Sequence, residues 1–73
     1  MPEEIFASKQ DVLFLEEALQ RLQEYKREVL LLNRYHGLRY EDIADICKCE
    51  IGAVKVRAHR ALKELRATFY QFR

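Results

Sequence analysis

The sequence predicts an all-α fold, a four-helix domain that contains a helix-turn-helix without a wing. The 73-residue chain has only two glycines and one proline, 49% hydrophobic and 34% charged residues, and apolar residues at three- and four-residue spacing. A chain of this length forms one core at most, because a small domain buries only about 60% of its unfolded surface. We therefore expect residues 1–8 to be a tail or linker and residues 9–73 a single domain.

Two helices are predicted in the first half of the chain. Ser8, with Asp11 three residues later, is the expected N-cap of the first. The second covers residues 25–35, and Gly37 is its expected left-handed end. We expect a break between the two, although periodicity alone also allows one continuous helix over residues 9–35. The first helix has its apolar positions at helical spacing: Val12, Leu15, Ala18, Leu19 and Leu22.

Two further helices are predicted after Gly37. A short helix over residues 40–47 has an acidic first turn, which suits the helix dipole. A turn at residues 48–50 separates it from the last and longest helix, residues 51–69, and two helices joined in this way are a helix-turn-helix candidate. The last helix has one apolar arc about 100° wide, typical of a core-facing stripe: Val54, Ala58, Ala61, Leu62, Leu65 and Phe69.

Charge is distributed unevenly along the chain, although the net charge is only +1. Residues 1–50 carry seven Lys/Arg against eleven Asp/Glu, or −4, and residues 51–73 carry six against one, or +5. A helix in the major groove uses Arg and Lys to reach guanine, and an apolar side chain to touch a thymine methyl. The last helix fits this role, with a merely solvated face as the alternative. Its face away from the apolar arc holds Lys55, Val56, His59, Arg60, Lys63 and Arg66.

Several other classes of site are disfavoured by the sequence. Cys47 and Cys49 lack the two-residue spacer of usual zinc sites, so we expect buried, reduced thiols, with a metal or redox sensor as the weaker alternative. His59 has neither a nucleophile nor a glycine-rich phosphate loop beside it. We therefore expect no metal, no cofactor and no enzymatic activity. With no apolar run of about 18–20 residues and an acidic N-terminus, we expect a cytoplasmic protein without a membrane segment.

Two stretches carry a family resemblance. The sequence Gly37-Leu-Arg-Tyr-Glu-Asp-Ile-Ala-Asp-Ile, followed by Ile51-Gly-Ala-Val-Lys-Val-Arg-Ala-His-Arg-Ala-Leu-Lys-Glu-Leu-Arg66, closely resembles region 4 of extracytoplasmic-function (ECF) sigma factors. Arg27-Glu-Val-Leu-Leu-Leu is similar to the second helix of that family, and the resemblance covers about residues 11–68. It implies a four-helix domain that binds the −35 promoter element in the major groove and docks on the flap of the RNA polymerase β subunit. Many relatives are also held inactive by an anti-sigma factor.

The resemblance also implies roles for individual residues. On the last helix, Lys55, Val56, His59 and Arg60 would face bases and nearby phosphates, with Lys63 on the same surface. Arg57 would support the fold or contact the DNA backbone. At the start of the preceding helix, Tyr40 and Glu41 match positions that approach DNA, and Arg39 could reach a phosphate.

Three departures from the family pattern affect these expectations. Relatives often carry Ser at the positions of Arg39 and Glu50, so both helices of the motif lack their preferred N-caps. Gln23 stands where relatives often break the first two helices with proline, which is why we place the break there. Ala53 and Val56 replace small hydroxyl residues, which favours methyl contact over hydrogen bonding.

Two sets of apolar residues do not fit the predicted core stripes fully. Phe14, Leu31 and Tyr35 either form a groove for the polymerase flap or an anti-sigma helix, or complete the core. The aromatic tail either packs on the first helix or binds a partner; it contains Phe69, Tyr70 and Phe72.

Two rival functions stay open, and so does the question of whether this chain is part of a longer protein. The rivals are a response-regulator output domain, which usually dimerises on DNA through its last helix, and an interaction module that does not bind DNA. A sigma factor also needs a domain that melts the start-proximal promoter element. We therefore expect this chain to be part of a longer protein, with a free-standing small regulator as the alternative.

Overall fold

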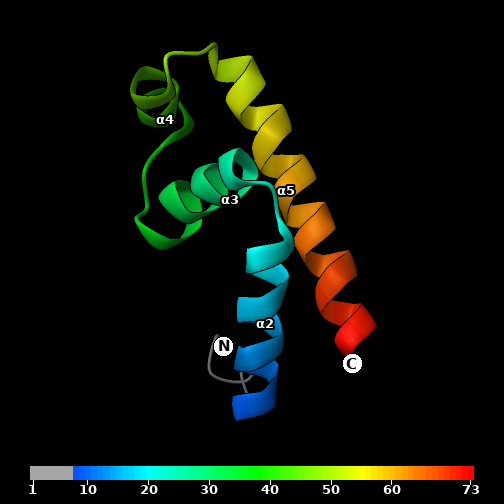
Figure 1. Ribbon diagram of the computed structural model, residues 1–73. Coiled ribbons are helices and arrows are strands. Elements are labelled where there is room, and N and C mark those ends of the chain that lie inside the picture. The colour runs from blue at the N-terminus through cyan, green and yellow to red at the C-terminus, as the bar shows by residue number, and fades with distance from the viewer. Residues whose placement is uncertain (1–7) are drawn as a thin grey trace.

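The computed structural model describes residues 8–73, which fold into helices joined by short turns (Figure 1). Helices α2 and α5 lie side by side and antiparallel, α3 lies across them, and α4 packs near the first half of α5. The predicted all-α, four-helix fold is confirmed, with α3 and η1 together as the second helix and α4 and α5 as the helix-turn-helix. The elements are α2 (Lys9–Arg21), α3 (Glu24–Leu30), the π-helical turn η1 (Leu31–Tyr35), α4 (Tyr40–Cys47) and α5 (Ile51–Phe72).

Helix α2 begins at the predicted cap. The Ser8 hydroxyl accepts a hydrogen bond from the Asp11 amide at 3.1 Å. This contact satisfies one of the N–H groups that a helix start leaves without a partner. Residues 1–7, where most of the expected tail falls, lie outside the described residues.

The break between α2 and α3 falls at Leu22 and Gln23, as predicted, and both residues are extended, with ψ of 147° and 146°. Arg27 of α3 stabilises this break. The Arg27 guanidinium donates to the backbone carbonyl oxygens at the end of α2, those of Leu19 and Gln20 at 3.4 Å and of Leu22 at 3.3 Å. A cation at these carbonyls satisfies their hydrogen bonds and complements the dipole of α2. The break therefore needs no proline.

The second helix reaches Tyr35, as predicted, but its last five residues are π-helical. The chain becomes π-helical at Leu31, and the His36 amide donates to the Leu31 carbonyl oxygen at 3.0 Å, five residues back. Periodicity misses this change because the π-helical stretch is only five residues long and no residue type in it marks a π-helix. Gly37 ends the helix in the left-handed region, as predicted, with φ of 72°. The Asn33 amide group then donates to the Leu38 carbonyl oxygen at 2.9 Å.

The turn of the helix-turn-helix depends on Lys48. Helix α4 has the predicted bounds, and Lys48 follows it with φ of 58°, in the left-handed region. The amides of Lys48 and Cys49 both donate to the Ala44 carbonyl oxygen, the latter at 3.0 Å. This is a Schellman-type end, formed here without glycine, which turns the chain sharply into α5.

The core consists of two clusters, and α5 contributes to both. We call them the α2 cluster, around Ala18, Leu22, Leu30, Ala61 and Leu65, and the HTH cluster, around Val29, Ile43, Ala44, Val54 and Ala58. The predicted apolar arc of α5 is confirmed, since all its members belong to one of these clusters or pack against it.

Helix α5 extends three residues beyond its predicted end at Phe69. The Phe72 ring packs against Phe14 of α2, with 5.6 Å between ring centroids, and the Arg21 guanidinium lies 4.8 Å from the Phe72 centroid. Phe69 also packs against the α2 cluster, whereas Tyr70 is 64% exposed. The aromatic tail is therefore split, with two rings packed on the body and one in solvent.

Candidate nucleic-acid interface

The outer face of α5 is cationic and exposed. Its opposite side is fixed in the two clusters through Val54, Ala58, Ala61 and Leu65, all buried. Helical geometry then turns the predicted DNA-contacting residues of α5 outward. Val56, at 48% exposure, lies among these cations. The predicted residues Lys55, Val56, His59, Arg60 and Lys63 are all exposed.

The start of α4 is arranged differently from this face. Arg39 is exposed, and its guanidinium pairs with Glu41 at 3.3 Å and with Asp42 at 3.5 Å. Tyr40 is half-buried against the HTH cluster, while Glu41 is exposed. Arg39 and Glu50 make no side-chain cap, as predicted. The Arg39 guanidinium is thus paired with carboxylates of α4, the helix that it precedes.

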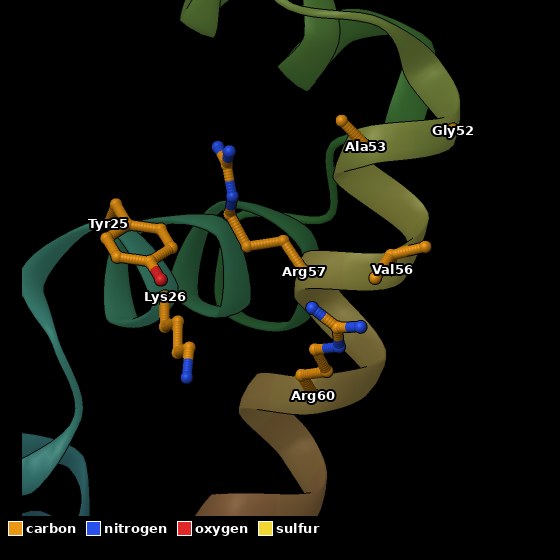
Figure 2. Close-up of a pocket in the computed structure, with 7 residues that line it drawn as sticks. All are labelled: Tyr25, Lys26, Gly52, Ala53, Val56, Arg57 and Arg60. Carbon is orange, nitrogen blue, oxygen red and sulfur yellow. The ribbon is translucent and has the colours of Figure 1, made fainter.

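A groove of about 470 Å³ separates the first half of α5 from the start of α3 (Figure 2). Arg57 leaves α5 and reaches across the groove toward α3, where its guanidinium lies 4.9 Å from the Tyr25 ring centroid. This cation–π contact holds the half-buried Arg57 side chain in place. The groove is lined by Tyr25, Lys26, Gly52, Ala53, Val56, Arg57 and Arg60, with no acidic residue among them.

Lys26 connects α3 to α5 below this groove. Its ammonium pairs with the Glu64 carboxylate, and the Lys26 side chain is only 16% exposed while that of Glu64 is 48% exposed. The one acidic side chain in residues 51–73 is therefore engaged by a lysine from another helix. Its charge opposes the cationic face of α5 less than the sequence suggests.

The three apolar residues expected to form a partner groove lie in two separate places. Phe14 is half-buried on α2 against Phe72, which is the core alternative. Leu31 and Tyr35 lie in η1, after α3, and are 36% and 80% exposed. The Tyr35 ring has a T-shaped contact with His36, at 5.1 Å between centroids. His36 caps the C-terminal end of η1.

Both cysteines are free thiols next to the HTH cluster, but they are half-buried where we expected buried. The Cys47 thiol lies 3.9 Å from a carboxylate oxygen of Glu28 on α3. Burial and, next, the Glu28 charge raise the pKa of the Cys47 thiol, and the nearby Arg57 opposes this only in part. Cys47 therefore stays protonated to higher pH than an ordinary cysteine.

Within residues 8–73, no three His, Cys, Asp or Glu side chains gather closely enough to hold a metal ion. None of the helices in this part of the chain is both long and apolar enough to span a membrane.

Sequence reasoning missed the contribution of α3 to this region. Tyr25, Lys26 and Glu28 contact α4 and α5 from positions 19 to 38 residues away in the chain. Periodicity reports which face of a helix is apolar but does not report which distant helix a polar residue meets. The one sequence feature that could have indicated these contacts is the cluster of Tyr25, Lys26 and Glu28 at the start of the short second helix.

Comparison with known proteins identifies the family of this domain. The sequence profile of the family described as Sigma-70, region 4 matches residues 15–65. The chain is 43% identical over 53 residues to the ECF RNA polymerase sigma factor EcfG of Rhodopseudomonas palustris, which is 73% of this chain and 29% of that protein. It is 42% identical over 45 residues to the RNA polymerase sigma-H factor of Pseudomonas aeruginosa, covering 62% and 23% of the two chains.

A third relative matches more of the chain. The ECF RNA polymerase sigma factor ShbA of Streptomyces griseus is 38% identical over 66 residues, which is 90% of this chain and 35% of that protein. The chain thus spans about a third or less of the length of these relatives. No solved structure matches it significantly. The match over residues 15–65, the helix-turn-helix and the sigma-factor relatives together show that this chain belongs to the sigma-70 region 4 family and is a region 4 of the ECF sigma-factor type.

Proposed function

We propose that this domain reads the −35 element of promoter DNA as the region 4 of an ECF sigma factor, in the cytoplasm and without enzymatic activity of its own. The observation that carries the proposal is the two-sided α5. Its apolar side is buried in both core clusters, and its cationic side is exposed around Val56. Such a helix fits the major groove, where Lys55 and Arg60 can donate to bases and Val56 can contact a thymine methyl.

The start of α4 adds positioning contacts to this proposal. Arg39, Tyr40 and Glu41 stand at the start of α4, the helix before α5 in the motif, and Arg39 is exposed and paired with two carboxylates. A DNA phosphate would compete with those carboxylates for the Arg39 guanidinium, since both present anionic oxygen acceptors to the same fork of donors. His59 and Lys63 continue the cationic face along α5 and would contact phosphates.

The test of DNA reading is selection of bound sequences from a random duplex pool, followed by affinity measurements on the selected duplex. Lys55→Ala and Arg60→Ala should each cost about 1–3 kcal/mol in specific binding if the side chains contact bases. The melting temperatures should stay close to wild type, because both side chains are exposed. Recovery of no preferred sequence, or unfolding of either variant at room temperature, would contradict the proposal.

The partner proposed for the rest of the surface is RNA polymerase, through the flap of its β subunit, with an anti-sigma factor as a competitor. Leu31 and Tyr35 of η1 are the exposed apolar side chains proposed for these contacts. Phe14 is engaged with Phe72, so we restrict the proposed partner surface to η1. Binding of the chain as a monomer to a flap fragment, weakened by Tyr35→Ala, is the expected result.

The two rival functions give other outcomes in the same experiments. A response-regulator output domain would dimerise on DNA through its last helix, but the second half of α5 here packs on α2 through Leu65, Phe69 and Phe72. That packing and the family favour the sigma assignment. A module that does not bind DNA would show no salt-dependent binding to any duplex.

A further inference from the structure

We propose that the groove between α3 and α5 is a second DNA contact, in which Lys26 and Tyr25 of α3 join Arg57 of α5 in holding a backbone phosphate. This inference rests on the proposed function and extends it from the helix-turn-helix to a helix outside that motif. The contact would fix the register of α5 in the major groove without reading sequence, because phosphate contacts position a protein on DNA.

The charge and place of the groove support this contact. The groove borders the outer face of α5, since Val56 and Arg60 line it and also belong to the surface proposed to meet bases. Three cationic side chains and the Tyr25 ring surround it, and its lining contains no Asp or Glu (Figure 2). A major groove is flanked by two phosphate backbones, so a helix lying in it has one of them along each side. A cationic groove at the edge of the helix is where such a backbone passes.

One cation of the groove is held in place before DNA arrives. The Arg57 guanidinium is packed over the Tyr25 ring, and fixing this long side chain in advance lowers the entropic cost of binding a phosphate. Lys26 is paired with Glu64, with only 16% of its side chain exposed, and a phosphate would take the place of that carboxylate.

Gly52 leaves open space at the edge of this groove. It lies in the first turn of α5 and lines the groove, and a Cβ built on it would meet nothing within 4 Å. Glycine at this position would let a DNA backbone come closer to α5 than a larger residue would allow.

The decisive experiment compares the two partners of the Lys26–Glu64 ion pair. Affinity for a short labelled duplex is measured across a salt series with Lys26→Gln and Glu64→Gln. If the pair serves only the fold, both variants lose the same interaction and shift in the same direction. If Lys26 binds a phosphate, Lys26→Gln weakens binding about threefold to tenfold and lowers the salt slope by about one unit. Glu64→Gln then frees the Lys26 charge and strengthens binding.

Matched controls separate this contact from a general effect of net charge. Arg21 and Glu17 form an exposed ion pair at the end of α2, and Arg21→Gln and Glu17→Gln make the same charge changes there. Both controls should bind DNA like the wild type. Equal effects at the two pairs would overturn the inference while leaving the proposed function intact, whereas failure of the wild type to bind any duplex would end both.

Two further measurements locate the contact. Duplexes with one neutral methylphosphonate linkage are scanned along each strand, and one position should weaken the wild type but cause no further loss in Lys26→Gln. Gly52→Ala should melt no lower than wild type and still bind DNA more weakly. A scan with no such position, or full binding by Gly52→Ala, would contradict a phosphate in this groove.

Discussion

The two halves of α5 look alike in sequence, both amphipathic and both basic, yet they are used differently. In the first half, the HTH cluster holds only the inner side of the helix, and Lys55 and Arg60 are exposed. In the second half, residues at the end of α5 bind α2: Phe72 stacks on Phe14, and Arg73 pairs with Asp11 at 3.6 Å. The charge of +5 counted over residues 51–73 is therefore not all available to DNA.

The two halves of α5 therefore have different roles. The second half packs α5 onto α2, and the first half exposes the cationic face while its inner side is buried in the HTH cluster. Val29, Ile43 and Val54 are the largest fully buried side chains, and all three belong to the HTH cluster. Damage to the HTH cluster should thus affect stability and DNA binding together, whereas damage to the packing of the second half on α2 should affect stability alone.

The largest effect is expected in the HTH cluster, which packs against the first half of α5. Ile43→Ala removes a fully buried side chain between α4 and α5 and should cost about 2–5 kcal/mol of unfolding free energy. Marginally stable small domains lose a large part of their stability from such a change, so DNA binding should fall with it. Urea denaturation measures the loss. Ile46→Ala on the same helix, where the side chain is 56% exposed, is the control and should change stability little.

The next effect concerns the junction of α2 and α3. Arg27→Ala removes three hydrogen bonds to the end of α2 and should cost about 1–3 kcal/mol of unfolding free energy. Thermal denaturation followed by circular dichroism measures it. Arg34→Ala, at an exposed position of η1, is the matched control. A variant at Arg27 as stable as the control would show that the break does not depend on this side chain.

A smaller effect should test the second half of α5. Phe72→Ala removes a half-buried ring and its contacts with Phe14 and Arg21, at about 1–2 kcal/mol of unfolding free energy. Well below its melting temperature, the variant should bind DNA with wild-type affinity. Tyr70→Ala, where the ring is largely in solvent, controls for loss of an aromatic residue. Lost affinity with unchanged stability would reverse the roles assigned to the two halves.

The smallest effect is expected on the reactivity of the Cys47 thiol. Because burial and Glu28 raise the pKa of Cys47, its alkylation should accelerate only at higher pH than for an ordinary thiol. The folded state favours the protonated thiol, so this contribution to stability is complete below the pKa of the unfolded chain and is lost as pH rises through the folded pKa. In a Cys49→Ser background, Glu28→Gln should speed alkylation and Glu24→Gln should not. Equal rates would remove Glu28 as a cause.

Much of the fold and half of the site could be predicted from the sequence, because both depend on local pattern. Residues close together in the sequence determine the apolar arc of α5, the Ser8 cap and the helix end at Gly37. The π-helical turn at Leu31 and the left-handed Lys48 were missed, because no residue type there marks them.

The contacts of α3 could not be predicted for a different reason. Tyr25 meets Arg57 and Lys26 meets Glu64 only after the chain has folded, and no periodicity links residues so far apart. The same holds for Arg27, whose place at the end of α2 stabilises a break that local sequence does not mark. The predicted groove of Phe14, Leu31 and Tyr35 does not form, because Phe14 packs on Phe72 while Leu31 and Tyr35 lie in η1.

The central claim is that DNA lies on α5 from Gly52 to Lys63 and not on the stretch from Leu65 to Phe72 that packs on α2. The most direct measurement is the change in backbone amide NMR shifts when the chain is titrated with its selected duplex. The account predicts the largest changes at residues 52–60, with smaller ones at the start of α4 and little change from Leu65 to Phe72. Changes concentrated at residues 65–72 and on α2 would contradict it.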